Sequence, residues 1–450
     1  MNHRLITCFR FALTALAIVA PASILRAQVP GLGTAPAVLT IDDAVKLALE
    51  RNLSIALAQS QVESSSARVT GAFGTFLPQI NLSGGYNKRL SNSTTLTDQS
   101  QLVPNSPDNS LSASAGASLQ LFDGFSRSSN FRGAQYSYDA SRQSLQRTKE
   151  DIIYQTRAAY LNALRAEQII DIRQSDLDFS RERLAQNKEL VEVGTAQIGV
   201  VYSQEAEVAN AELSLEQART DVVMARNNLL ALLNLDPVNE PQLSSEGLAS
   251  SVDSAMVADA RQQLGASAVL FQRQGEQRLD IKAAKLRLEA AAMSVTAAKA
   301  GYYPSISTTI GWNWQKYGDI PSSSGSQFGL NLQYTPFDGF RTKEQVELAE
   351  ANRQSAEIDL RRLEIQARSD LRQTLARLDG AERQLRAADK AVASAKQNRY
   401  AANERYRLGA GSFTDVLLAN SQFLTAQINQ VNAVFSYRLA LYEVRYQAGE

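Results

Sequence analysis

Apolar residues recur at helical spacing through two very long stretches of this chain. In the stretch from Phe340 to Leu408, apolar positions are separated by three or four residues and no proline intervenes. The average step of about 3.5 residues is typical of helices that pack along a left-handed seam. The seam positions are Leu360, Leu363, Ala367, Leu371, Leu375, Leu378, Ala381, Leu385, Ala388, Val392 and Ala395. About 69 residues at 1.5 Å each predict a rod of about 100 Å, which needs partner helices along its length.

Four shorter stretches alternate apolar and polar residues, and this period of two predicts β-strands at about 78–88, 110–122, 304–316 and 326–337. One face of each strand is apolar, and the other is rich in Ser, Asn, Gln and Gly. This pattern is typical of membrane strands with lipid on the apolar side. The aromatic residues expected to face the membrane are Tyr86, Trp312, Trp314, Phe328 and Tyr334. The alternative is two soluble hairpins half-buried on a helical body.

Four strands cannot close a membrane barrel, for which about eight strands are the practical minimum. Unpaired sheet edges are not tolerated in lipid, because their backbone groups find no hydrogen-bond partners there. If these strands enter a membrane, several copies of the chain must therefore share one barrel, and we expect an oligomer.

The order of these elements occurs twice. Repeat 1 spans residues 28–237, a connector with short helices spans 238–276, and repeat 2 spans 277–450. Each repeat has a half-length helix, a strand pair, a long helix and a return helix. The long helices are expected at about 124–193 and 339–408, and the return helices at about 199–234 and 413–447. The entering helix of repeat 1 is expected to run from Ile41, capped by Thr40, to about Phe76.

The segment Phe-Asp-Gly-Phe follows the second strand of each repeat, at 122–125 and 337–340. Asp is a favoured helix N-cap, so the aspartates should begin the long helices. Prolines should end the entering helices, because proline lacks the N–H donor. The predicted helix–strand junctions are Pro78, Asp123, Gly124, Pro304, Asp338 and Gly339.

The first 27 residues have the pattern of a signal peptide, with Arg4 and Arg10 flanking the apolar run that ends near Ala20. A transmembrane anchor is the alternative, but the run is shorter than about 20 residues. Cleavage would remove His3 and Cys8, the only histidine and the only cysteine. Ser-His-Asp and Cys-His catalysis and the common zinc sites are then excluded. We expect neither an enzyme nor a cofactor.

The charge balance and the absence of one motif exclude two further classes of function. Lys plus Arg and Asp plus Glu number 46 each, a balance that argues against a nucleic-acid partner. The sequence contains no GxxxxGK[ST] phosphate loop, so the chain does not hydrolyse nucleotides by that route.

The duplication, the two Phe-Asp-Gly-Phe segments and the segment YRLGAGSFTDVL at 406–417 resemble the TolC-like outer-membrane efflux protein family. The resemblance covers nearly the whole mature chain. It implies a mainly helical protein with a small membrane β-barrel part, assembled as a homotrimer with a 12-stranded barrel in the outer membrane. A periplasmic helical barrel would continue it and meet an adaptor (membrane fusion protein), and through it an inner-membrane pump. The implied function is a passive duct for drugs, toxic small molecules or secreted proteins.

By this resemblance, the helical tips form the periplasmic gate and contact the adaptor. Tyr406 matches the family's gate tyrosine, and Asp415 matches an acidic constriction position. The first tip departs from the pattern: it lacks the Arg-aromatic pair, and Val200 stands where the alignment of the repeats places Asp415. Gly411 occupies a position that is often basic in the family. The predicted tip residues are Gly194, Thr195, Tyr406, Arg407, Gly409, Gly411, Ser412 and Asp415.

Three alternatives stay open at this stage. Within the channel class they are a type I protein-secretion duct and a metal-ion efflux duct of the same architecture. Soft-metal coordination is disfavoured, because the mature chain offers only Met224, Met256 and Met293. In a different class, the chain could be a structural coiled-coil protein of the periplasm.

Overall fold

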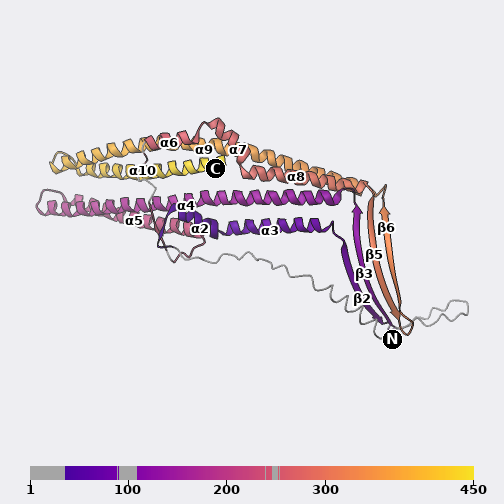
Figure 1. The fold of residues 1–450 in the computed structure, drawn as a ribbon. Helices are drawn as coiled ribbons and strands as arrows, with labels where there is room; N and C mark the ends of the chain where they lie inside the picture. The colour runs from indigo at the N-terminus through magenta and orange to yellow at the C-terminus, as the bar shows by residue number, and fades with distance from the viewer. Residues whose placement is uncertain are drawn as a thin grey trace.

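Two copies of one element order form two helical layers that share a β-sheet at one end (Figure 1). The computed structural model describes residues 36–88, 90, 109–238, 240–245, 252 and 254–449. The predicted signal peptide, with His3 and Cys8, lies outside these residues. The predicted fold class, mainly helical with two tandem repeats, is confirmed.

The elements follow in the order that the alternating and helical patterns indicate. Repeat 1 contains β1 (Val38–Leu39), α2 (Ile41–Arg51), α3 (Leu53–Gly74), β2 (Gln79–Lys88), β3 (Asn109–Phe122), α4 (Ser126–Glu192) and α5 (Ile198–Leu232). The connector contains β4 (Gln242–Leu243), α6 (Ser254–Leu264) and α7 (Ser267–Gln277). Repeat 2 contains α8 (Leu279–Lys299), the 3-10 turn η2 (Ala300–Tyr302), β5 (Ser305–Tyr317), β6 (Ser323–Gln333), α9 (Arg341–Arg407) and α10 (Phe413–Ala448).

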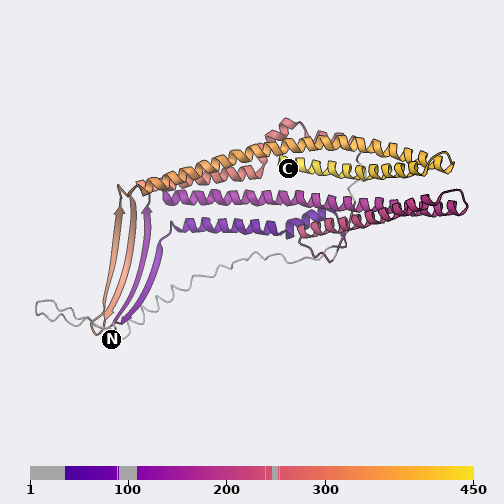
Figure 2. The same cartoon turned by 180° about the vertical axis from the view of Figure 1, so that it is seen from behind.

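The two long helices, α4 and α9, have 67 residues each. At 1.5 Å per residue each is about 100 Å long. Shorter helices line each of them end to end: α3 and α5 pack on α4, and α8 and α10 pack on α9. Figure 2 shows the two helical tips together at the end opposite the sheet.

The predicted continuous helix from Ile41 to about Phe76 is wrong, because Asn52 divides it into α2 and α3. Asn52 has an extended ψ of 127°, and its side-chain oxygen accepts the N–H of Ser54 at 2.8 Å. Its amide nitrogen donates to the carbonyl of Leu232 at 2.8 Å, at the end of α5. Arg278 has nearly the same backbone angles between α7 and α8, so the break occurs in both repeats.

The four long strands form one antiparallel sheet in the order β2-β3-β5-β6. Its register separates the two side-chain classes, because residues paired across strands point to the same face. Ile80 pairs with Ala117, Ala117 with Ile310, and Ile310 with Phe328, which is an entirely apolar row. The strand β6 ends earlier than the predicted 326–337, and Pro336, which has no N–H to donate, follows it.

A small parallel sheet of β1 and β4, which the sequence did not indicate, ties the connector to repeat 1. The buried hydroxyl of Tyr160, on α4, lies 2.7 Å from the carbonyls of both Leu39 and Ser244. Apolar clusters on each long helix surround this level and form the core, one centred on Leu161 and Leu229 and the other on Leu371 and Leu378.

Candidate functional site

The two helical tips share one backbone geometry. Gly194 and Gly409 have φ of 74° and 70°, a left-handed conformation that only glycine adopts without strain. The N–H of each glycine bonds the carbonyl three residues earlier at 3.0 Å. The next residue bonds the carbonyl five residues earlier, at 2.9 Å for Thr195 and 2.8 Å for Ala410. Both long helices therefore end in the same hydrogen-bonded turn.

The return helix of the second tip begins with a reciprocal cap. The hydroxyl oxygen of Ser412 accepts the N–H of Asp415 at 3.2 Å, and Oδ2 of Asp415 accepts the N–H of Ser412 at 3.2 Å. Gly411 precedes the cap, where an added Cβ would lie 3.1 Å from the Cβ of Arg405. Asp415 thus has a capping role in this structure, and its predicted role at a constriction stays a prediction.

Tyr406 lies between the second tip and the long helix of the other repeat. Its hydroxyl donates to Oδ1 of Asn187 on α4 at 3.4 Å, and its ring lies 5.8 Å from that of Phe413. Asn187 is only 1% exposed. Arg407 instead points to solvent and pairs with Glu404 at 2.7 Å within its own helix. The structure therefore places Tyr406 against repeat 1 and Arg407 on the exposed surface.

The first tip has fewer side-chain contacts. The hydroxyl of Thr195 donates to the carbonyl of Leu190 at 2.9 Å. The residue at the N-cap of α5 is Gln197, which makes no side-chain capping bond. The first tip therefore lacks a counterpart of the Ser412–Asp415 cap.

Above the tips, charged and aromatic side chains join the two hairpins in a cluster that the sequence did not indicate. We call this group the inter-hairpin cluster; its members are Asp176, Phe179, Arg183, Arg399, Asn403, Asn420 and Phe423. The guanidinium of Arg399 lies 4.0 Å from the ring centre of Phe423 and 5.5 Å from that of Phe179. Such cation–π contacts strengthen when they are shielded from water.

The remaining contacts of the inter-hairpin cluster are polar. Arg183 donates to the side chain of Asn403, and Asn420 donates to Asp176 at 3.0 Å. Burial raises the pKa of Asp176, although the bond from Asn420 and the charges of Arg173 and Arg399 oppose this. Burial also lowers the pKa of Arg399, which Asp176 partly restores. These groups come from α4, α9 and α10, so the cluster joins three helices.

A second contact between the repeats lies nearer the middle of the long helices. The guanidinium of Arg147 lies 3.9 Å from the ring centre of Tyr446, and the ring of Tyr154 stacks on Tyr446 at 5.0 Å. Burial is the main cause that raises the pKa of both tyrosines to about 12. The end of α10 is thereby held on α4 through uncharged phenols.

The strand-to-helix junctions are nearly identical in the two repeats. Oδ2 of Asp123 accepts the N–H of Arg127 at 2.9 Å, and Oδ2 of Asp338 accepts the N–H of Thr342 at 2.8 Å. The bond from the Thr342 hydroxyl is the largest cause that lowers the pKa of Asp338, and the bond from the Thr342 N–H lowers it further. The aspartates accept first-turn N–H groups, but the N-cap positions belong to Phe125 and Phe340, so the predicted N-cap assignment of Asp123 and Asp338 is wrong.

The glycines and prolines of the junctions occupy equivalent places in the two repeats. A Cβ on Gly124 would lie 2.7 Å from the carbonyl oxygen of Ala300, so this close approach requires glycine. Gly339 also has a positive φ of 70°. Pro78 and Pro304 directly precede β2 and β5.

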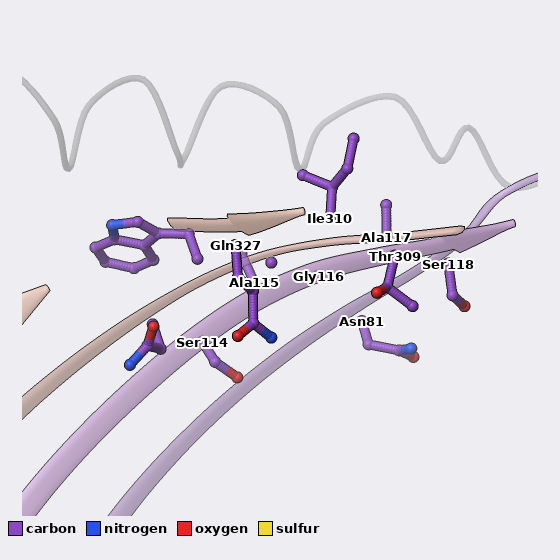
Figure 3. Close-up of a pocket in the computed structure, with 12 residues that line it drawn as sticks. Asn81, Ser114, Ala115, Gly116, Ala117, Ser118, Thr309, Ile310 and Gln327 are labelled. Atoms are coloured by element: carbon purple, nitrogen blue, oxygen red, sulfur yellow. The ribbon is translucent and has the colours of Figure 1, made fainter. Parts of the chain in front are cut away.

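The sheet carries the predicted aromatic residues on or beside its apolar side. Tyr86, Trp312 and Phe328 are exposed, Trp314 is half-buried, and Tyr334 lies just beyond β6. Figure 3 shows Ile310 and Ala117 on one side of the strands and Asn81, Ser114, Ser118 and Thr309 on the other. A shallow pocket at this level is lined by side chains of all four strands.

No helix in the described part of the chain is long and apolar enough to cross a membrane. In the same part of the chain, no three or more His, Cys, Asp or Glu residues are grouped so that they could hold a metal ion.

The comparisons with known proteins agree with this geometry. The sequence pattern of the outer membrane efflux protein family matches residues 44–235 and 270–450, one segment for each repeat. The chain belongs to this family. The outer membrane protein TolC of Vibrio cholerae is 24% identical over 409 residues, which are 89% of each chain. CyaE of Bordetella pertussis is 26% identical over 428 residues, covering 92% of this chain and 84% of that protein.

Solved structures of such channels share the fold. The outer membrane protein VceC of Vibrio cholerae superposes with a TM-score of 0.76 at 18% identity, covering 91% of this chain and 96% of that one. The CmeC outer membrane channel of Campylobacter jejuni gives 0.78 at 19% identity, covering 91% and 85%. As a member of the outer membrane efflux protein family, the chain is an outer-membrane channel component of an efflux system. The proteins that it resembles are channels rather than enzymes.

Proposed function

We propose that three copies of this chain join their sheets into a 12-stranded barrel in the outer membrane, continued by a helical duct in the periplasm. The observation that carries the proposal is the sheet, which has an exposed apolar face, a polar face and edge strands β2 and β6. Lipid tolerates no unpaired strand edge. Joining β2 of one copy to β6 of the next removes every edge when the ring closes.

The same register supports a water-filled passage. The face opposite the apolar row carries Asn81, Ser114, Thr309, Gln327 and their neighbours. A lumen lined with Ser, Asn, Gln and Thr suits hydrated cargo, because such side chains hydrogen-bond water without selecting one charge. The duct is passive in this proposal and has no catalytic residues or cofactor, so a pump in the inner membrane supplies the energy.

The tips are the proposed contact with a periplasmic adaptor and the proposed gate. The exposed residues Thr414 and Asp415, with Arg407 nearby, lie where the two helices of the second hairpin meet. Tyr406 reaches Asn187 and so ties the second tip to the first hairpin. Oδ2 of Asp415 accepts the N–H of Ser412, so the same exposed carboxylate can cap α10 and border the entrance.

Names of relatives suggest the range of cargo. CusC of Escherichia coli is named a cation efflux system protein, and OpmQ of Pseudomonas putida a pyoverdine export protein. We propose drugs, other toxic small molecules or secreted proteins as the cargo class of this chain. Deleting its gene should sensitise the cell to the compounds that its partner pump exports, and returning the gene should restore resistance.

The decisive test places a charge on either face of one strand. Phe328 lies at the middle of β6 and is 73% exposed on the apolar face, whereas its neighbour Gln327 faces the other way. Phe328→Arg should cost about 2–4 kcal/mol near the bilayer midplane and reduce the heat-modifiable trimer seen on a gel. Gln327→Arg is the matched control and should still assemble. Equal assembly of both variants, or recovery of the wild type as soluble periplasmic protein, would exclude the proposed barrel.

A further inference from the structure

Two phenylalanines have a backbone conformation that is rare for their type. Phe125 and Phe340 have φ of 71° and 69°, and the only other non-glycine residue with positive φ in the described chain is Asn234. Asn visits the left-handed region readily, whereas a bulky aromatic residue there is a genuine outlier. Strain of this kind persists where the surrounding structure imposes it, and it often marks a functional position.

The strained residues are not buried in the protein. Phe125 is 60% exposed and Phe340 is 67% exposed. Each ring makes an edge-to-face contact with the ring three residues earlier, Phe122 or Phe337, with ring centres 5.5 Å apart. The interplanar angles are 85° and 86°, so the two repeats hold their rings in the same way. Burial within this chain therefore does not offset the strain.

The strand register indicates that the ring of Phe125 extends the apolar face beyond the end of the sheet. Phe122 pairs with Ile306, and Ile306 pairs with Leu332, whose side chain is exposed on the apolar face. Because the ring of Phe125 packs edge-to-face against that of Phe122, it lies just past the last apolar row. Exposed Tyr302 and Tyr303 lie at the same junction, and exposed Arg341 begins α9 beside Phe340. Aromatic and cationic side chains favour the headgroup level of a bilayer.

A neighbouring copy does not explain both rings. Phe340 follows β6, an edge strand that would contact the next copy, but Phe125 follows β3, an interior strand of the sheet. The two residues nevertheless have nearly the same backbone φ, the same edge-to-face ring contact and similar exposure. A subunit interface would therefore adjoin only Phe340, whereas a membrane boundary would adjoin both residues.

We propose that Phe125 and Phe340 are membrane wedges. Their rings insert among phospholipid chains just beneath the periplasmic headgroups and set the depth of the sheet in the bilayer. The left-handed backbone directs each ring outward, at a position where the chain turns from strand to helix. This inference rests on the proposed insertion of the apolar sheet face into the outer membrane.

The test uses single tryptophans in full-length protein reconstituted into phospholipid vesicles. The chain has two tryptophans, so W312F/W314F provides a background for F125W, F340W and the control Y400W, which is exposed on α9. The variant W314F retains Trp312 as a reference within the sheet. Each protein is placed in vesicles whose lipid chains carry bromine near either the glycerol end or the methyl end, since bromine quenches only nearby tryptophan.

We expect bromine near the glycerol end to quench F125W and F340W by about half, and bromine near the methyl end to quench them less. Y400W should be unaffected by both lipids. Quenching of Trp312 together with no more quenching of F125W and F340W than of Y400W would overturn the wedges, showing that water or another copy covers these positions. Absence of Trp312 quenching would instead contradict the membrane placement of the sheet.

A second measurement separates membrane anchoring from folding. The double variant F125G/F340G removes both rings and also relieves the backbone strain, because glycine adopts positive φ freely. It should melt in detergent no lower than the wild type, yet insert into vesicles several-fold less. The double variant F125L/F340L retains apolar volume and should insert to an intermediate degree. Unchanged insertion of the glycine variant would contradict the proposal.

Discussion

The two helical tips have the same backbone and different side chains. Gly194 and Gly409 make the same turn with matching hydrogen bonds. Only the second tip adds the Ser412–Asp415 cap and the contact from Tyr406 to the other hairpin. Reversal of a helical hairpin therefore needs little more than a glycine, and the additional groups of the second tip are available for the proposed gate. The inter-hairpin cluster joins α4, α9 and α10, whereas at the tips the bond from Tyr406 to Asn187 joins the two hairpins.

Among changes in the two helical hairpins, the largest expected effect comes from the inter-hairpin cluster rather than from a tip. Arg399→Ala removes the guanidinium from between Phe179 and Phe423 and leaves the half-buried Asp176 with less positive charge nearby. We expect a loss of about 2 kcal/mol in the free energy of unfolding. Spin labels on the two hairpins should also move apart. Arg407→Ala, which breaks only an exposed pair, is the control and should cost under about 0.5 kcal/mol. A loss for Arg399→Ala no larger than that for Arg407→Ala would show that the inter-hairpin cluster does not hold the repeats together.

Next in size is the turn that the tips share. Gly409→Val forces a β-branched residue into positive φ and should cost about 1–2 kcal/mol, measured by thermal unfolding in detergent. An added Cβ meets no atom within 4 Å at either glycine, so the cost is one of backbone conformation. Gly194→Val should therefore cost the same, and Gly409→Asn less. If the two valine variants lose clearly different amounts of stability, the two turns are not equivalent.

Changes at the N-caps of the two return helices should have smaller effects on stability, and these effects should be opposite in sign. Ser412→Ala removes the side-chain acceptor for Asp415 N–H and should cost about 1 kcal/mol. Gln197→Ser introduces such an acceptor at the uncapped start of α5 and should stabilise by up to about 1 kcal/mol. Circular dichroism melts of both variants would check this. If both changes destabilise, the absence of a cap at Gln197 has another structural reason.

The smallest expected effect is on the pH dependence of stability. Burial raises the pKa of Asp176 above its ordinary 3.8, so the folded state binds this proton more tightly than the unfolded state. Its contribution to stability is then fully present below pH 3.8 and is lost as the pH rises through the folded pKa. Asp176→Asn should flatten this part of the stability profile, measured by melting at successive pH values. An unchanged slope in Asp176→Asn would contradict this assignment.

Local patterns predicted most of the fold. The helix bounds of α4 and α9 differ from the predicted 124–193 and 339–408 by a residue or two, since glycines lie just beyond their ends. The strands follow the period of two, and the duplication supports each assignment by its copy. The break at Asn52 was missed because it depends on a hydrogen bond to Leu232, which is distant in the sequence. No proline or glycine announces it.

Among the residues of the candidate site, some were predicted from local patterns and others were not. The tip glycines and the motif around Tyr406 located the ends of the hairpins. The positive φ of Phe125 and Phe340 was not predicted, because the Phe-Asp-Gly-Phe segment reads as a plain capping signal. Asp176, Arg399 and Phe423 were not singled out, since each lies in a helical run with no distinguishing motif.

By itself, the sequence determined the type, length and order of the elements, because these depend on residue spacing and on nearby glycine and proline. Only the tertiary structure decided which polar residues of α4 face α9 and α10. The physical reason is helix geometry: a straight helix drifts by about 20° per heptad against a 3.5-residue repeat. Along 67 residues this drift moves the contact face around the helix, so the partners of Asp176 and Arg399 follow from packing and not from spacing.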